Sequence, residues 1–242
     1  MPLTDGRVVE GETHKRLWDD HVARYQSVTT YVDQGKVLDI ACGTGYGSKL
    51  LKEAGAVRVW GIDISLEAIE HAREKYNAEG VQFLVGDITS IPLPAAFVDI
   101  VACFETIEHV EDYEGVIDEL CRVLKSDGML IISTPNRKLS SSGRGLSDKP
   151  RNKYHRVEFT VEDLRRLLEP RFEKLIFYGQ RFVPKIFFLP GMGLLRRAIL
   201  FCGFYTPDRG RGTPALQEIS SEYEPWYITV QCRQLRDCSG RH

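Results

Sequence analysis

The sequence lacks several features that would assign it to a specialised class of protein. It contains no run of about 18 apolar residues, so no membrane-spanning helix is expected. Its N-terminus, MPLTDGRVVEGE, has no apolar signal core. The 32 basic and 34 acidic residues give a formal net charge of −2, which provides no global electrostatic argument for nucleic-acid binding. We expect a cytoplasmic protein with a single core and a modest insertion, for which nucleic acid is a disfavoured partner.

The cysteines also lack a pattern. The six cysteines form no CxxC pair and no spaced metal quartet. Cys103 lies in the apolar run DIVACF and Cys121 in ELCRVL, where a free thiol behaves as a small hydrophobe. Reduced thiols in an intracellular protein are therefore expected.

What the sequence has is a regular alternation from Val37 onward. Apolar runs at 36–41, 57–63, 81–87, 97–105 and 128–134 predict buried strands. Helices are expected at 47–54, 65–77 and 112–125, the last ending at the Ser-Asp-Gly of 126–128. Uniformly apolar strands that alternate with amphipathic helices predict an α/β fold with a mostly parallel sheet and helices on both faces.

The alternation of predicted strands and helices is interrupted after Pro135. The polar, basic stretch 136–156 is interpreted as a mobile loop, followed by a helix at 159–170 and strands at 172–179 and 225–232. A helix at 13–32 is expected to cross the sheet edge. The predicted organisation is an N-terminal helical cap (1–35), a cofactor-binding core (36–181 and 225–233) and an inserted lid or substrate-binding segment (182–224).

The stretch VLDIACGTGYG at 37–47 is the most informative. A dinucleotide-binding loop needs G-x-G-x-x-G, but the third glycine here, Gly47, falls one residue early after Gly43 and Gly45. Asp39 would repel a phosphate, whereas it would favour a ligand with an ammonium group and no phosphate. S-adenosylmethionine is such a ligand, and glycine allows its close approach. A tight strand-to-helix turn in an unrelated fold is the alternative.

Acidic residues end the next two strands. Asp63 follows the second strand, where it can take two ribose hydroxyls, and Asp87 follows the third, where it can contact an adenine edge. FETIEHV ends the fourth strand at the same carboxyl edge of the sheet. Each aspartate alone could be a helix cap or a turn residue.

These motifs resemble those of the class I S-adenosylmethionine-dependent methyltransferases over nearly all of the chain from Val37 to Cys232: VLDIACGTG, GIDIS, GDITSIPLP, VDIVACFETIEHV and LKSDGMLIISTPN. The resemblance implies a Rossmann-like, seven-stranded sheet whose last strand runs antiparallel beside the fifth. It also implies a set of cofactor-binding residues: Asp39, Ala41, Gly43, Gly45, Asp63, Ile64, Gly86, Asp87, Ile88 and Phe104. Arg24 matches the arginine that ubiquinone-pathway O-methyltransferases use for the cofactor carboxylate; a surface helix charge is the alternative.

A second constellation follows the fourth strand. Glu105, Glu108 and His109 have i, i+3, i+4 spacing, which suits Mg²⁺ or Mn²⁺ if a helical turn forms there. The same ExxEH string occurs in ubiquinone-type O-methyltransferases and in small-RNA 3′-terminal 2′-O-methyltransferases, and His155 resembles the fourth ligand of the RNA enzymes. Without a metal, His109 or His155 could act as general base; the alternative is a solvated first turn with no catalytic role. The candidate catalytic residues are thus Glu105, His109 and His155.

The acceptor is less constrained. The cations of 136–156 could clamp a phosphorylated or carboxylated substrate, or simply be solvated. The apolar insertion could be a lid, an interfacial anchor or the face of a homodimer. TDGRVVEGETHKRLWDDHVARY looks like bacterial methyltransferases of glycan pathways. We therefore expect methylation of a sugar, glycan or quinone-like hydroxyl, with a metal-dependent RNA 2′-O-methyltransferase or a non-catalytic cofactor-binding partner protein as alternatives.

Overall fold

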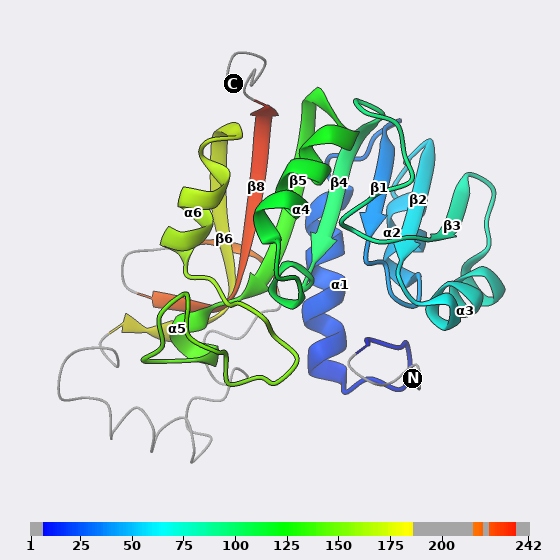
Figure 1. The fold of residues 1–242 in the computed structure, drawn as a ribbon. Helices are drawn as coiled ribbons and strands as arrows, with labels where there is room; N and C mark the ends of the chain where they lie inside the picture. Colours follow the sequence, from blue (N-terminus) through cyan, green and yellow to red (C-terminus); the bar gives the residue numbers. More distant parts are fainter. Residues whose placement is uncertain (1–6, 186–214, 220–222, 236–242) are drawn as a thin grey trace.

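The computed structural model describes residues 7–185, 215–219 and 223–235. In these ranges one eight-stranded sheet has the order β3-β2-β1-β4-β5-β8-β6-β7 (Figure 1). Neighbours from β3 through β5 pair in parallel, and β8 pairs antiparallel with both β5 and β6. The predicted α/β class and the reversed last strand beside the fifth are confirmed; the two-residue β7 is additional. The strands are β1 (Lys36–Ile40), β2 (Arg58–Asp63), β3 (Val81–Val85), β4 (Val98–Phe104), β5 (Leu124–Pro135), β6 (Phe172–Pro184), β7 (Gln217–Glu218) and β8 (Tyr223–Leu235).

Helices cover both faces of the sheet because successive strand residues point to opposite sides. Val37 of β1 packs in a core with α1, α2 and α3, whereas Leu38 packs in a second core with α4 and α6. The helical elements are α1 (Lys15–Thr29), α2 (Tyr46–Glu53), α3 (Leu66–Tyr76), the 3₁₀ turn η1 (Ile107–His109), α4 (Tyr113–Val123), α5 (Arg137–Ser140) and α6 (Val161–Leu168).

The position of α1 differs from the expectation. Figure 1 shows α1 behind the strands, and its Tyr25 and Val28 are buried in the same core as Ile100 of β4 and Ile131 of β5. The helix therefore covers a face of the sheet, and not its edge. The physical reason is the apolar stripe that Tyr25 and Val28 form at i, i+3 spacing, which needs a broad apolar surface to bury it.

The end of α4 also differs. The helix ends at Val123, and β5 begins at Leu124 and runs through the Ser-Asp-Gly that had been predicted to cap the helix. Leu124 pairs with Val98, while the next paired residue, Met129, faces Ile100. Residues 125–128 thus form an irregularity within the strand.

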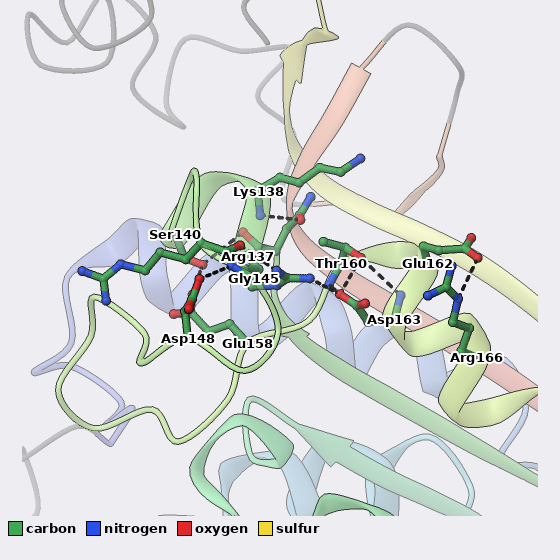
Figure 2. Close-up of polar contacts among 12 residues, drawn as sticks. Arg137, Lys138, Ser140, Gly145, Asp148, Glu158, Thr160, Glu162, Asp163 and Arg166 are labelled. Carbon is green, nitrogen blue, oxygen red and sulfur yellow. Dashed lines mark hydrogen bonds and ion pairs between the residues drawn. The ribbon is translucent and has the colours of Figure 1, made fainter. Parts of the chain in front are cut away.

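The stretch 136–156, expected to be mobile, is tied down by hydrogen bonds. It contains α5, whose Arg137 guanidinium pairs with Asp163 of α6 (Figure 2). The same guanidinium donates to the Arg144 carbonyl at 2.6 Å, and the Arg151 amide donates to Ser141 Oγ at 2.8 Å. Three of the seven cations of this stretch (Arg137, Arg144 and Arg151) are thus used inside it or against α6.

The strands β6 and β8 extend into the predicted insertion. Phe182 pairs with Pro225 and Pro184 with Tyr223, so both ends of the 182–224 segment belong to the sheet. Most of the segment, including the apolar stretch interpreted as a lid, lies outside the described residues. Within the described ranges, no helix combines the length and apolarity needed to cross a bilayer.

Candidate functional site

A cavity of about 400 Å³ opens at the carboxyl edge of the parallel strands. Strand ends of a parallel sheet meet at one edge, which brings together segments that are far apart in the sequence. Seven of the predicted site residues line the cavity: Ala41, Asp63, Ile64, Gly86, Asp87, Ile88 and His109. The sequence had not marked the other residues that line it, namely Ile40, Thr89, Thr106, Val110, Glu111 and, as a site residue, Arg156.

Asp63 is one of the charged residues that line the cavity. Its Oδ2 accepts from the Gly43 amide and its Oδ1 from the Ser65 amide, each at 2.9 Å. The carboxylate therefore joins the glycine loop after β1 to the start of α3. The guanidinium of Arg7, for which the sequence held no recognisable signal, lies 3.8 Å from Oδ1.

Ile64 and Ile88 supply apolar walls of the same cavity. Ile64 has 68% of its surface exposed, so it presents an apolar surface that a ligand in the cavity can cover. Asp87 Oδ1 accepts from the Thr89 amide at 2.9 Å and from its hydroxyl at 2.8 Å, so this aspartate shapes the turn that carries Ile88.

Glycine occupies the three positions of the loop for different physical reasons. At Gly43, which has φ +54°, an added Cβ would meet nothing within 4 Å. At Gly45 it would lie 2.6 Å from Ala72 Cβ, and at Gly47 it would lie 2.0 Å from the ring of Tyr25. Gly45 and Gly47 are therefore required by packing against α3 and α1, whereas Gly43 leaves open space for a ligand.

Asp39 does not line the cavity. It is buried on the face of β1 that α1 covers, where it accepts from Tyr25 Oη at 2.9 Å and from Ser48 Oγ at 2.6 Å. Burial raises the pKa of Asp39 to about 7, although both hydrogen bonds act in the opposite direction. The structure therefore gives Asp39 a role in anchoring α1, in place of the direct repulsion of phosphate that we had inferred. Phe104 is buried on the same face and packs edge-on against Tyr25 at 5.0 Å.

Arg24 is fully buried, which excludes the alternative of a surface helix charge. None of its three guanidinium nitrogens has a hydrogen-bond partner in the described parts of the chain. The guanidinium carbon lies 4.4 Å above the Tyr227 ring, and a guanidinium nitrogen lies 3.8 Å from Glu105 Oε1. Because a buried cation without hydrogen bonds is costly, this site favours an additional anion.

The predicted metal group is brought together only in part. One ligand atom each from Glu108, His109 and His155 lies within 4.8 Å of the others. Glu105 is not in this group, since its carboxylate accepts from Ser133 Oγ at 2.7 Å and faces Arg24. The reason is local: Glu105 has φ +50° and the helical turn begins only at Ile107, so the expected i, i+3, i+4 face does not form.

Both histidines have one ring nitrogen engaged. His109 Nδ1 lies 3.0 Å from the Tyr154 carbonyl oxygen, and His155 Nδ1 lies 2.6 Å from Glu158 Oε1. Since these oxygens accept, each Nδ1 is the donor, and in a neutral ring the lone pair is then on Nε2. Loss of hydration lowers the pKa of His109, which favours the neutral base near pH 7. Burial and the nearby charge of Glu105 raise the pKa of Glu108 well above its usual value.

The chain is similar to known methyltransferases in sequence. Residues 38–132 match the family model described as a methyltransferase domain. A probable S-adenosylmethionine-dependent methyltransferase of Mycolicibacterium smegmatis is 35% identical over 170 residues, which are 70% of this chain and 64% of the relative. A ubiquinone biosynthesis O-methyltransferase of Haemophilus ducreyi is 38% identical over 113 residues, 44% of this chain and 48% of the relative. This chain thus spans less than two thirds of either curated relative.

A solved structure extends the likeness to the remainder of the fold. A methyltransferase of Thermotoga maritima, described as a possible histamine N-methyltransferase, superposes with a TM-score of 0.63 at 20% identity, covering 91% of this chain and 93% of the other. At that identity the likeness concerns the fold alone. Together with the sequence matches and the strand order, it shows that this chain belongs to the class I S-adenosylmethionine-dependent methyltransferases.

Proposed function

We propose that the protein transfers a methyl group from S-adenosylmethionine to a hydroxyl oxygen of a small molecule, either a sugar, a glycan or a quinone-like compound. The observation that carries this proposal is a neutral imidazole, His109, on the wall of the strand-end cavity with its Nε2 free of the Tyr154 contact. The likeness to a ubiquinone biosynthesis O-methyltransferase supports oxygen as the acceptor atom.

The residues around the cavity fit this cofactor. Asp63 offers a carboxylate to the ribose hydroxyls, and Ile64 and Ile88 offer apolar walls to the adenine. Gly43 leaves room for the sulfonium end, since nothing stands within 4 Å of its missing side chain. Arg24, which is buried and has no hydrogen bond to the residues that the structure describes, is matched in charge to the cofactor's carboxylate. Asp39 supports this arrangement indirectly by fixing α1, which carries Arg24.

The chain's own contribution to the reaction is alignment and proton removal. When bound, the cofactor supplies an electrophilic methyl group on a sulfonium. His109 Nε2 accepts the proton of the acceptor hydroxyl as the oxygen attacks, and the Tyr154 carbonyl holds the ring in the required tautomer. Holding oxygen, methyl carbon and sulfur in one line accounts for the larger share of the rate, and proton removal for about 10²–10⁴-fold.

A metal-assisted version of this function is the second candidate, favoured by the cluster of Glu108, His109 and His155. One carboxylate and two imidazoles suit Mn²⁺ better than the all-oxygen ligand sets typical of Mg²⁺. The donor chemistry fits, because each imidazole donates its Nδ1 proton to a protein oxygen and presents Nε2. Such an ion would lower the pKa of the acceptor hydroxyl. The exposed amide of Asn152, now 2.8 Å from His155 Nε2, would have to turn away.

The test uses a panel of catechols, hydroxybenzoates, free sugars and short RNAs with isotopically methyl-labelled cofactor. We expect labelled product and S-adenosylhomocysteine with a phenol or a sugar, and a loss of turnover of at least about tenfold in His109→Gln. Methylation of RNA alone would support the RNA alternative. Cofactor binding without S-adenosylhomocysteine formation would support a non-catalytic partner protein. Turnover that EDTA abolishes and Mn²⁺ restores would assign the metal-assisted version; full turnover in EDTA would exclude it.

A further inference from the structure

Glu158 is a buried carboxylate that the proposed reaction does not yet use. Its side chain is 1% exposed, although it follows the polar stretch 136–156. Its Oε1 lies 2.6 Å from His155 Nδ1, and its Oε2 accepts from Ser140 Oγ, also at 2.6 Å. Both carboxylate oxygens thus have a donor, and the two donors come from different segments of the chain.

The position of Glu158 is fixed from two sides. Ser140 ends α5, and Figure 2 shows its side chain and that of Glu158 linked above the loop. The helix α5 is itself held against α6 by the ion pair between Arg137 and Asp163. A carboxylate locked in this way directs a single acceptor oxygen at the imidazole of His155.

The hydrogen bond decides which nitrogen of His155 is protonated. An ionised carboxylate only accepts, so the proton of the neutral ring stays on Nδ1. The lone pair is then on Nε2, which lies beside the amide of Asn152 and belongs to the group formed with Glu108 and His109. The two imidazoles stand edge to face, with ring centroids 5.1 Å apart and planes at 82°.

We propose that Glu158 is a positioning residue that holds His155 in its Nδ1–H tautomer, with Nε2 directed toward Glu108 and His109, and that Asn152 occupies Nε2 until a ligand replaces it. The chemistry of Nε2 rests on the proposed function. The tautomer does not, because it can be measured with neither cofactor nor acceptor bound.

The sequence contains a matched control. Glu162, four residues further along, pairs with Arg166 at 3.2 Å on the exposed face of α6 (Figure 2). Glu158→Gln and Glu162→Gln are therefore the same chemical change, in the same short segment, with and without contact to an imidazole. Glu158→Gln keeps the shape but adds an N–H donor that can bond to an unprotonated Nδ1.

The experiment is a long-range ¹H–¹⁵N correlation spectrum of the histidine rings at a pH where they are neutral, with His155 identified by the loss of its signals in His155→Gln. We expect the Nδ1–H form in the unsubstituted protein and in Glu162→Gln, and an Nε2–H or mixed form in Glu158→Gln. An Nε2–H tautomer in the unsubstituted protein would overturn the proposal; this reading needs no variant, and so stands even if Glu158→Gln fails to fold.

Turnover supplies the second readout. We expect Glu158→Gln to lower kcat about tenfold or more while the KM for the cofactor stays within about twofold, and Glu162→Gln to change neither. A purely structural role would change KM and stability and leave the tautomer unaltered, which would contradict the proposal. If no acceptor is methylated by any variant, the proposed function fails, and the tautomer measurement still decides the role of Glu158.

Discussion

Asp39 is a carboxylate enclosed between β1 and α1, where it accepts hydrogen bonds from Tyr25 and Ser48. Its pKa is raised from 3.8 to about 7, chiefly by burial, so the folded protein holds a proton that the unfolded chain releases above pH 4. The stability linked to this proton is complete below the unfolded pKa and is lost as the pH rises through the folded pKa. We expect the wild type to lose about 2–3 kcal/mol relative to Asp39→Asn between pH 5 and pH 8.

The measurement is urea unfolding of both proteins at several pH values. Asparagine can still accept from Tyr25 and donate to Ser48, so the variant should fold while removing only the titration. Taking the difference between the two proteins cancels every other titrating group. A difference that does not change with pH, or one with the opposite slope, would show that Asp39 is ionised in the folded state at pH 5.

Asp63 provides the corresponding prediction for binding. Its carboxylate is placed on the cavity wall by the Gly43 and Ser65 amides. We expect Asp63→Ala to weaken S-adenosylhomocysteine binding by about 10–100-fold, since hydrogen bonds to a charged group contribute about 1.5–3 kcal/mol. Calorimetric titration measures this, with Glu70→Ala on the exposed side of α3 as the control. Equal affinities in both variants would remove Asp63 from the ribose site.

The contrast between Asp39 and Asp63 shows how far single residues can be predicted from the sequence. Asp63 is the last residue of its strand, so the sequence alone places it at the ligand-binding edge. Asp39 lies one residue before the end of β1 and points to the face that α1 covers, which depends on where α1 packs. The prediction that Glu105 shares a helical face with Glu108 and His109 was wrong for a similar reason. Glu105 has a positive φ, and helical spacing in a sequence does not reveal such a backbone conformation.

At the scale of elements, the turn from β1 into α2 contains one glycine that matters for stability and one that is expected to matter for binding. Gly47→Ala would drive its Cβ into the Tyr25 ring, so we expect a loss of about 1–3 kcal/mol in the free energy of unfolding. The Cβ of Gly43→Ala would meet no atom within 4 Å. We therefore expect it to lower the free energy of unfolding only through backbone strain, by about 1–2 kcal/mol at φ +54°. Its methyl group would, however, project into the space assigned to the cofactor.

These two variants are compared by unfolding and by calorimetric titration with S-adenosylhomocysteine. We expect Gly43→Ala to weaken binding at least about tenfold, and Gly47→Ala, where it remains folded, to weaken it much less. The reverse order would mean that the open space beside Gly43 is not the cofactor site.

Element types were predictable here, while their ends and partners were not. Each apolar run became a strand, because a two-sided parallel sheet buries both faces. The Ser-Asp-Gly of 126–128 failed as a stop signal because Leu124 already pairs with Val98, and strand pairing outweighed the local preference for a turn. For the cations of the 136–156 stretch, the sequence left open a clamp for a phosphorylated or carboxylated substrate and simple solvation. Arg137 is bound to Asp163, a partner that no sequence pattern links to it.

At the scale of the whole molecule, the order of the strands is the property least accessible to periodicity. Alternating strands and helices imply a parallel sheet, but they do not imply that β8 enters between β5 and β6 in reverse. That expectation came from the resemblance to a known family. At the carboxyl edge of the parallel strands, residues from the ends of β1, β2 and β3 and from the turn after β4 line one cavity.

Because that cavity joins so many elements, a ligand that binds there should stabilise the entire fold. S-adenosylhomocysteine at 100 times its Kd adds about 2.7 kcal/mol to the free energy of unfolding, which corresponds to a rise in Tm of about 5–11 °C for a chain of this size.

We expect 5′-methylthioadenosine at the same concentration to give a clearly smaller rise, because it lacks the carboxylate that Arg24 is proposed to bind. Arg24→Met should abolish this difference between the ligands. The variant also loses the ion pair with Glu105 and the contact with the Tyr227 ring, so each rise is measured from the Tm of the unliganded variant. Equal rises for both ligands in the wild type would place the carboxylate away from Arg24.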